Sequence, residues 1–200
     1  MAEAINHTNP DRSSYFDWSP VWAGTAVAVA SSLVLTQFGA AAGLGAGDTM
    51  VNETTASWGV TVAGLWLAVT ALSASTAGGY LAGRMRMPLA VADASEREFR
   101  DGVHGLTVWA VSTVVALLAM SLLSLSASVG ATAAVTAAAA EVPETVARYA
   151  RNGSVILAFS TAASAALGAA AAWFAAELGG RHRDENISIH QLVPAFMRRT

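Results

Sequence analysis

The sequence contains no cysteine and no lysine, and only 12% of its 200 residues are charged. Without cysteine, the chain has no disulfides, thiolate metal sites, iron–sulfur clusters or cysteine nucleophiles. The 11 basic residues are all arginine and lie in short clusters between apolar runs, which excludes a broad basic face for nucleic acid. Soluble domains carry about 25% charged residues, so the composition also excludes an ordinary soluble domain.

Hydrophobic residues make up 54% of the chain, and they gather in four segments whose cores contain no Asp, Glu, Lys or Arg. A helix needs about 20 apolar residues to cross the hydrocarbon core of a bilayer. We place the spans at about 20–45, 56–83, 103–131 and 154–178 within a membrane domain of residues 20–180. The Ala-rich stretch 131–140 is expected to project beyond the membrane, followed by a short amphipathic piece at 143–151. The predicted fold is an all-α integral membrane four-helix bundle.

Polar segments flank these spans at both ends of the sequence. The first 19 residues lack an apolar stretch, so we expect no cleavable signal peptide. Aromatic rings near the start of the first span are expected to anchor it at the headgroup layer: Tyr15, Phe16, Trp18 and Trp22. Residues 181–200 form a tail in which apolar side chains recur at helical spacing, so it is predicted to be amphipathic.

Arginines are distributed unequally between the two sides of the predicted bundle. Nine lie on one side: Arg12, Arg84, Arg86, Arg97, Arg100, Arg181, Arg183, Arg198 and Arg199. The opposite side has only Arg148 and Arg151. The positive-inside rule therefore predicts that both termini are cytoplasmic. The lack of lysine and the excess of alanine and glycine are typical of a GC-rich bacterial genome, so we expect a bacterial inner membrane.

Small residues recur every four positions on three of the spans, which places each set on one helical face. The sets are Gly39, Gly43 and Gly47; Ser75, Gly79 and Gly83; and Ser160, Ser164, Gly168, Ala172, Ala176 and Gly180. Helices in lipid associate mainly through such close backbone approach. Two interpretations remain open: the sets hold the four helices together, or at least one set docks a partner or a second copy. Bulky leucines such as Leu65 and Leu118 are expected to face lipid or to fill gaps.

The second and fourth spans end in similar sequences. Gly83, Arg84 and Arg86 match Gly180, Arg181 and Arg183 at an offset of 97 residues. The similarity indicates two repeated helical hairpins in a 2+2 arrangement, which occurs both in transporters and in plain bundles.

Ionisable side chains, which ion and proton transport usually needs inside the membrane, are missing from the four cores. Glu177 lies one turn from Arg181, where an ion pair is expected. His104 and His182 lie near one membrane face and could ligate a haem or a metal, but the expected role of His104 is a hydrogen-bonded contact near the arginine-rich segment. Residues 93–101 are expected to form a solvated turn or short helix, with docking as the alternative. No catalytic residue, cofactor or metal site is predicted.

Several short motifs resemble those of an uncharacterised bacterial family of small membrane proteins, labelled YrzE-like or PhnA-like. They are W-A-G and G-A-A-A-G-L-G in the first span, G-G-Y-L-A-G-R closing the second, and D-G-V-H-G-L-T-V-W-A opening the third. The resemblance covers about residues 18–125. It implies no established activity, and it makes Gly78, Gly79, Gly83, His104 and Trp109 the signature positions of the family.

Small-residue faces without catalytic groups predict a non-enzymatic protein that acts by helix–helix association. It would be a homo-oligomer or an accessory subunit of a larger membrane assembly, such as a respiratory complex. The expected partners are membrane lipid and other integral membrane proteins or a second copy. The alternative is a pore or transporter for a small neutral solute, favoured by the repeat and by Ser, Thr and Gln37 side chains in the spans.

Overall fold

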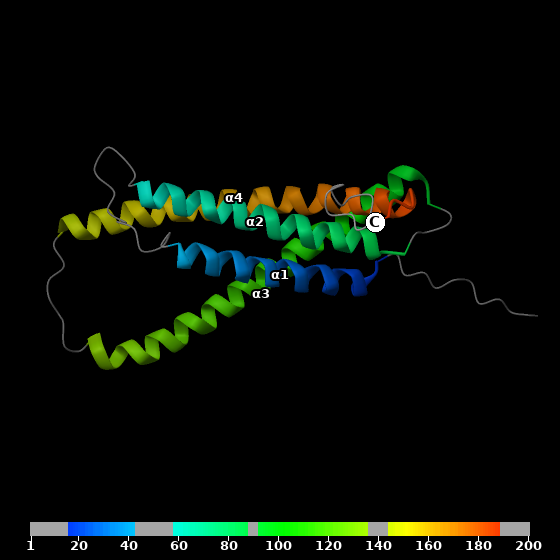
Figure 1. Ribbon diagram of the computed structural model, residues 1–200. Helices are drawn as coiled ribbons and strands as arrows, with labels where there is room; N and C mark the ends of the chain where they lie inside the picture. The colour runs from blue at the N-terminus through cyan, green and yellow to red at the C-terminus, as the bar shows by residue number, and fades with distance from the viewer. Residues whose placement is uncertain (1–15, 43–57, 88–91, 136–143, 189–200) are drawn as a thin grey trace, which may run out of the picture.

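The computed structural model describes residues 16–42, 58–87, 92–135 and 144–188. Within these ranges the chain has four helices and no strand: α1 (Trp18–Ala41), α2 (Trp58–Met85), α3 (Ala94–Val135) and α4 (Glu144–Asp184) (Figure 1). Each helix includes a segment long and apolar enough to cross a membrane. The predicted all-α membrane bundle of four helices is confirmed.

Two helices are longer than the predicted spans. The 42 residues of α3 begin at Ala94, so most of the charged segment 93–101 forms the first turns of this helix. At 1.5 Å per residue α3 is about 63 Å long, roughly twice the thickness of the hydrocarbon core. Its last residues, 131–135, belong to the predicted projection, and 136–140 lie outside the described residues. The helix α4 is continuous from Glu144, so the prediction of a separate piece at 143–151 is wrong.

The helices meet at one end of the bundle, where α1 and α3 begin and α2 and α4 end (Figure 1). We call this the polar end. From there α2 runs along α4, and α1 packs on α2 and α3, whereas α1 and α4 make no contact within the described residues. The helix α3 crosses the bundle and diverges from α4 toward the other end (Figure 1). The bundle is therefore tight at the polar end and open at the other.

Small residues let the helices approach closely near the polar end. Gly24 of α1 faces Gly78 of α2, and a Cβ atom added to Gly24 would lie 2.5 Å from the carbonyl oxygen of Gly78. A Cβ added to Gly83 of α2 would overlap the backbone of Ala176 in α4. These two contacts require glycine because the opposing atoms are backbone and cannot move aside.

Large apolar side chains lie on the outside of the bundle and small ones inside, which is the opposite of their distribution in a soluble protein. The buried apolar core is made of alanines and two valines, such as Ala28, Ala82, Val21 and Val108. Large apolar side chains face outward, among them Leu65, Leu117, Leu118, Leu122, Phe159 and Phe174, each at least 60% exposed. Water would strongly oppose such exposure, whereas lipid tails accept it. The chain is a multi-pass integral membrane protein.

Candidate functional site

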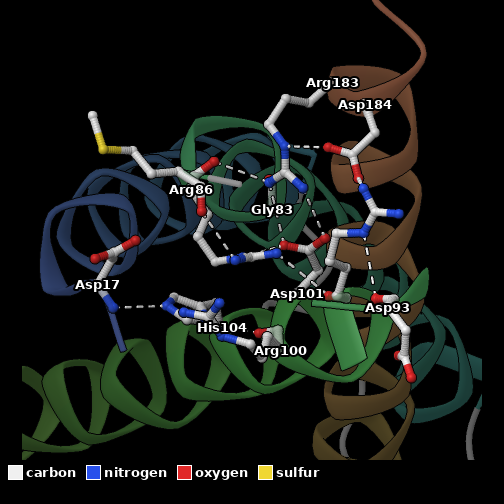
Figure 2. A network of polar contacts seen from close by, with 11 residues as sticks. Asp17, Gly83, Arg86, Asp93, Arg100, Asp101, His104, Arg183 and Asp184 are labelled. Atoms are coloured by element: carbon white, nitrogen blue, oxygen red, sulfur yellow. Dashed lines mark hydrogen bonds and ion pairs between the residues drawn. The ribbon is translucent and has the colours of Figure 1, made fainter. Parts of the chain in front are cut away.

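A buried carboxylate joins three helices at the polar end. Asp101, in the second turn of α3, accepts a hydrogen bond from Nε of Arg86 at 2.5 Å and lies 3.3 Å from a guanidinium nitrogen of Arg183 (Figure 2). Arg86 follows the last residue of α2, and Arg183 belongs to the last turn of α4. The two arginines hold matching positions in the similar sequences that end the second and fourth spans. A single side chain therefore fixes the ends of both helices to the start of α3.

Arg183 also closes the end of α2. Its Nη1 donates to the carbonyl oxygens of Gly83 at 2.7 Å and Arg86 at 3.0 Å (Figure 2). The last four carbonyls of a helix lack partners within the helix, and a cation is favoured there because it also meets the negative end of the helix dipole. Arg86 in turn donates to the carbonyl oxygens of Met87 and Arg97. The carbonyl oxygens of Gly83, Arg86 and Met87 are thus satisfied by the side chains of Arg183 and Arg86.

His104 connects the start of α1 to α3. The backbone N–H of Asp17 donates to Nε2 of His104 at 3.0 Å, and Nδ1 lies 2.7 Å from the carbonyl oxygen of Arg100 (Figure 2). Since an N–H can only donate and a carbonyl can only accept, these partners assign the proton to Nδ1 of a neutral imidazole. The ring also stacks on Phe16, with centroids 4.4 Å apart. Both nitrogens are engaged, which leaves neither free to ligate a haem or metal.

Other polar contacts surround this network. The phenol oxygen of Tyr80 and Nδ1 of His182 lie 3.2 Å apart. Glu177 accepts a hydrogen bond from the indole of Trp173 at 2.5 Å and makes no ion pair with Arg181 within the described residues, which differs from the prediction. The described residues contain no group of three or more His, Asp or Glu side chains that could hold a metal.

The predicted small-residue positions that the structure describes lie between helices. Gly79 and Gly83 of α2 contact the backbone of Ala172 and Ala176 in α4, and Gly180 contacts Asp101. Nearer the open end, Gly39 lies against Trp66, Ser160 lies beside Gly64, and Gly168 adjoins Ser75 and Trp109. Ser164 is buried at the boundary of the cavity described next. Gly43 and Gly47 lie outside the described residues.

The five signature positions of the family resemblance follow the same pattern. Gly78 meets Gly24, Gly79 and Gly83 meet α4, and His104 holds the start of α1. Trp109 lines a cavity. These residues all lie at helix contacts or at the cavity wall.

An open cavity of about 280 Å³ is lined by residues of all four helices. Seven of its fifteen lining residues carry a hydroxyl group: Ser32 from α1, Thr70 and Ser75 from α2, Ser112 and Thr113 from α3, and Thr161 and Ser164 from α4. Trp109 adds an aromatic ring to the wall. The lining contains no ionisable residue. The cavity is therefore uncharged, and its accessible surface is mostly apolar.

Sequence reasoning did not assign a role to Asp101 and did not predict the cavity. A signal for Asp101 was available, because an acidic residue just before an apolar span needs a partner, and two matching arginines follow the neighbouring spans. The cavity had only the abundance of Ser and Thr as a signal, and most hydroxyls in membrane helices bond their own backbone. Which Ser and Thr residues line one cavity depends on how the helices cross.

The polar end and the cavity differ in chemistry. Arg86, Arg183 and Asp101 of the polar end pair with one another and join helix ends, whereas the residues that line the cavity carry no charge. No protein-family model, curated protein or solved structure matches this chain.

Proposed function

We propose that this protein is non-enzymatic and works by associating with other transmembrane helices, as an accessory subunit of a larger membrane complex or as a homo-oligomer. The observation that carries the proposal is an exposed stretch of α3. From Val114 to Ala119 every side chain is exposed, which covers the whole circumference of the helix. This stretch of α3 offers its whole circumference to a partner helix.

Packing is the main force that holds helices together in lipid. Around Leu117 and Leu118, which are 63% and 60% exposed, α3 carries the small residues Ala116, Ala119 and Ser121. A partner helix could approach the backbone there without displacing large side chains. The inward-facing small residues of α2 and α4 are already used within the bundle, which leaves α3 as the better candidate surface.

Native mass spectrometry of protein extracted gently from its own membranes tests this proposal. We expect a homo-oligomer or a set of larger co-purifying subunits, and a lone monomer would refute the proposal. Because the chain has no cysteine, single-cysteine variants report specific positions cleanly. Leu118→Cys should crosslink to the partner, whereas Phe174→Cys, on the outer face of α4 near the polar end, serves as the matched exposed control.

We also propose that the protein lies in a bacterial inner membrane with both termini in the cytoplasm. The nine arginines on one side against two on the other support this orientation. The helix α1 begins and α4 ends at the same end of the bundle (Figure 1). Labelling of Ser188→Cys from the cytoplasmic side only is the expected result, and labelling from the outside would reverse the assignment.

A pore or transporter for a small neutral solute is the second candidate function, and the uncharged hydroxyl-lined cavity favours it. Liposomes that contain the protein should then equilibrate glycerol or urea faster than empty vesicles. Flux equal to that of empty vesicles would remove this candidate without affecting the association proposal.

A further inference from the structure

We propose that an outer groove between α2 and α4 binds one anionic phospholipid, with an acyl chain in the groove and the phosphate on Arg84 and Arg181. The groove is lined by residues of these two helices, among them Ala77, Tyr80, Ala171, Phe174, Ala175 and Leu178. This inference goes beyond the association proposed above, because the site lies within one copy of the chain and shares no residue with the exposed stretch of α3.

The groove suits an alkyl chain. Small side chains such as Ala77 and Ala175 leave space between the helices, and Ala175 is only 7% exposed. Phe174 and Leu178 stand out from α4 beside them, at 66% and 40% exposed. In a multi-pass membrane protein such an outward-facing apolar groove opens to lipid, where acyl chains are the molecules that surround the helices.

The helix faces that line the groove lead to two arginines. On α2, Arg84 comes one turn after Tyr80, and its Nη1 lies 3.4 Å from the phenol oxygen of Tyr80. On α4, Arg181 comes seven residues after Phe174, which is nearly two full turns and places both on the same side of the helix. At 1.5 Å per residue, each arginine lies only about 4–6 Å along its helix from the last groove residue.

These two arginines lack the counter-charge that the other pair of the repeated sequence has. Arg86 and Arg183, which occupy matching positions, share the carboxylate of Asp101. Arg84 and Arg181 also match each other, but neither makes an ion pair within the described residues. The inner pair of arginines is therefore neutralised within the protein, whereas the outer pair is available to an external anion.

Both outer arginines have hydrogen-bond donors to offer. A guanidinium has five N–H groups, and Arg84 uses two of them in described contacts, on Tyr80 and on the carbonyl oxygen of Ile187. Arg181 is exposed, and its side chain makes no hydrogen bond in the described part of the chain. Glu185, one turn later on α4, is also exposed and does not pair with it. The planar guanidinium fork matches the oxygens of a phosphate.

An anionic phospholipid combines the two features that the site requires. Its phosphate is joined directly to acyl chains, so one molecule reaches both the arginines and the groove. Basic pockets between membrane helices favour anionic headgroups. A zwitterionic phospholipid carries the same phosphate together with a cation, which offsets the attraction to the arginines.

Native mass spectrometry of the delipidated full-length protein tests the proposal. We would titrate phosphatidylglycerol and phosphatidylcholine with identical acyl chains into the protein in detergent. One arginine near the membrane surface contributes about fivefold in affinity, so two should make phosphatidylglycerol bind about thirtyfold more tightly than phosphatidylcholine. Glycerol phosphate has the phosphate without the acyl chains, and it should not bind in the same concentration range.

Arg181→Gln should weaken phosphatidylglycerol binding about fivefold and leave phosphatidylcholine unchanged, and the double variant with Arg84→Gln should lose the preference. Arg97→Gln is the matched control, since it removes the same charge from the polar end but belongs to α3 and pairs with Asp184. If the double variant does not fold, Arg181→Gln alone carries the test. Ala77→Leu places a larger side chain in the groove and should weaken both lipids.

Four results would overturn the proposal. Equal affinity of the wild type for the two lipids, or equal losses in Arg181→Gln and Arg97→Gln, would leave only general surface charge. Tight binding of glycerol phosphate would indicate a site for free phosphate. A changed oligomeric state of Ala77→Leu with unchanged lipid binding would assign the groove to a partner helix. Because the masses of monomer and oligomer are resolved separately, a failure of lipid binding is distinguishable from a failure of the association proposal.

Discussion

Nε of Arg86 lies 2.5 Å from Oδ1 of Asp101, and the two side chains are 0% and 3% exposed. The ion pair joins the end of α2 to the second turn of α3, and Arg183 adds α4 to the same carboxylate. Asp101 thus sets the relative position of three helices at the polar end. The exposed stretch of α3 and the cavity both lie beyond this junction, where α3 diverges from α4 (Figure 1).

Replacing Asp101 by asparagine should strongly destabilise the bundle. The variant leaves Arg86 buried without its counter-charge and removes one partner of Arg183, and breaking a buried ion pair in this way costs about 3–5 kcal/mol. Unfolding in a detergent mixture with increasing SDS measures the loss. Glu98→Gln, one turn earlier on the exposed surface of α3, is the matched control and should change the free energy of unfolding by less than about 0.5 kcal/mol. Equal stability of the two variants would show that Asp101 does not hold the helix ends.

Two glycines of α2 should respond in opposite ways to alanine. A Cβ at Gly83 would overlap the carbonyl of Ala176, so Gly83→Ala must push α2 and α4 apart, and overpacking of this kind costs about 1–3 kcal/mol. A Cβ at Gly64 would lie 3.1 Å from Oγ of Ser160, a side chain that can rotate away. Alanine is the better helix former by up to about 1 kcal/mol, so Gly64→Ala should be neutral or stabilising. The same SDS titration checks both variants, and a Gly83→Ala protein as stable as the wild type would contradict the close contact.

Much of the fold followed from hydropathy, but the use of the small residues depended on helix geometry. Successive positions at a spacing of four drift by about 40° around a helix of 3.6 residues per turn. Accordingly, Ser160, the first residue of the small-residue set on α4, contacts α2, whereas Gly180, the last residue of the set, contacts Asp101 of α3. The set is continuous in the sequence, but in the structure its two ends contact different helices. These residues therefore pack inside the bundle, although their regular spacing suggested one external surface as an alternative.

The start of α3 was harder to predict for a different reason. Charged residues at 93–101 indicate a loop when only hydropathy is considered, since a span is expected to begin where the charges end. Asp93 accepts hydrogen bonds from the backbone N–H of Glu96 at 2.8 Å and the hydroxyl of Ser95 at 2.9 Å. This N-cap starts the helix before the apolar run and carries Asp101 inward among the arginines. Capping, rather than hydrophobicity, decides where this helix begins.

The same cap predicts a dependence on pH. The hydrogen bond from the backbone of Glu96, and then that from Ser95, lower the pKa of Asp93 below its ordinary 3.8. Because the folded pKa is depressed, the contribution of Asp93 to stability is present above the unfolded pKa, and it is lost as the pH falls through the folded pKa. Carboxyl ¹³C NMR should give a pKa below 3.8, and Ser95→Ala should move it back toward that value. A pKa above 3.8 in the wild type would mean that the cap is not formed.

His104 should hold the start of α1 through a single backbone hydrogen bond. The N–H of Asp17 belongs to the N-cap residue of α1, where no acceptor is available within the helix, so any protection of this amide from hydrogen exchange must come from Nε2 of His104. His104→Phe retains a ring that can stack on Phe16 but cannot accept that bond. We expect fast exchange at Asp17 and a loss of about 1–3 kcal/mol.

His182→Phe is the control for this variant, since it removes another partly buried imidazole of the polar end while leaving the N–H of Asp17 in place. Its Asp17 amide should stay protected. Imidazole ¹⁵N spectra of the wild type, with the His104 signals identified from the His104→Phe variant, should show the proton on Nδ1. A proton on Nε2 would be incompatible with donation from Asp17, and together with an unprotected Asp17 amide it would exclude this link between α1 and α3.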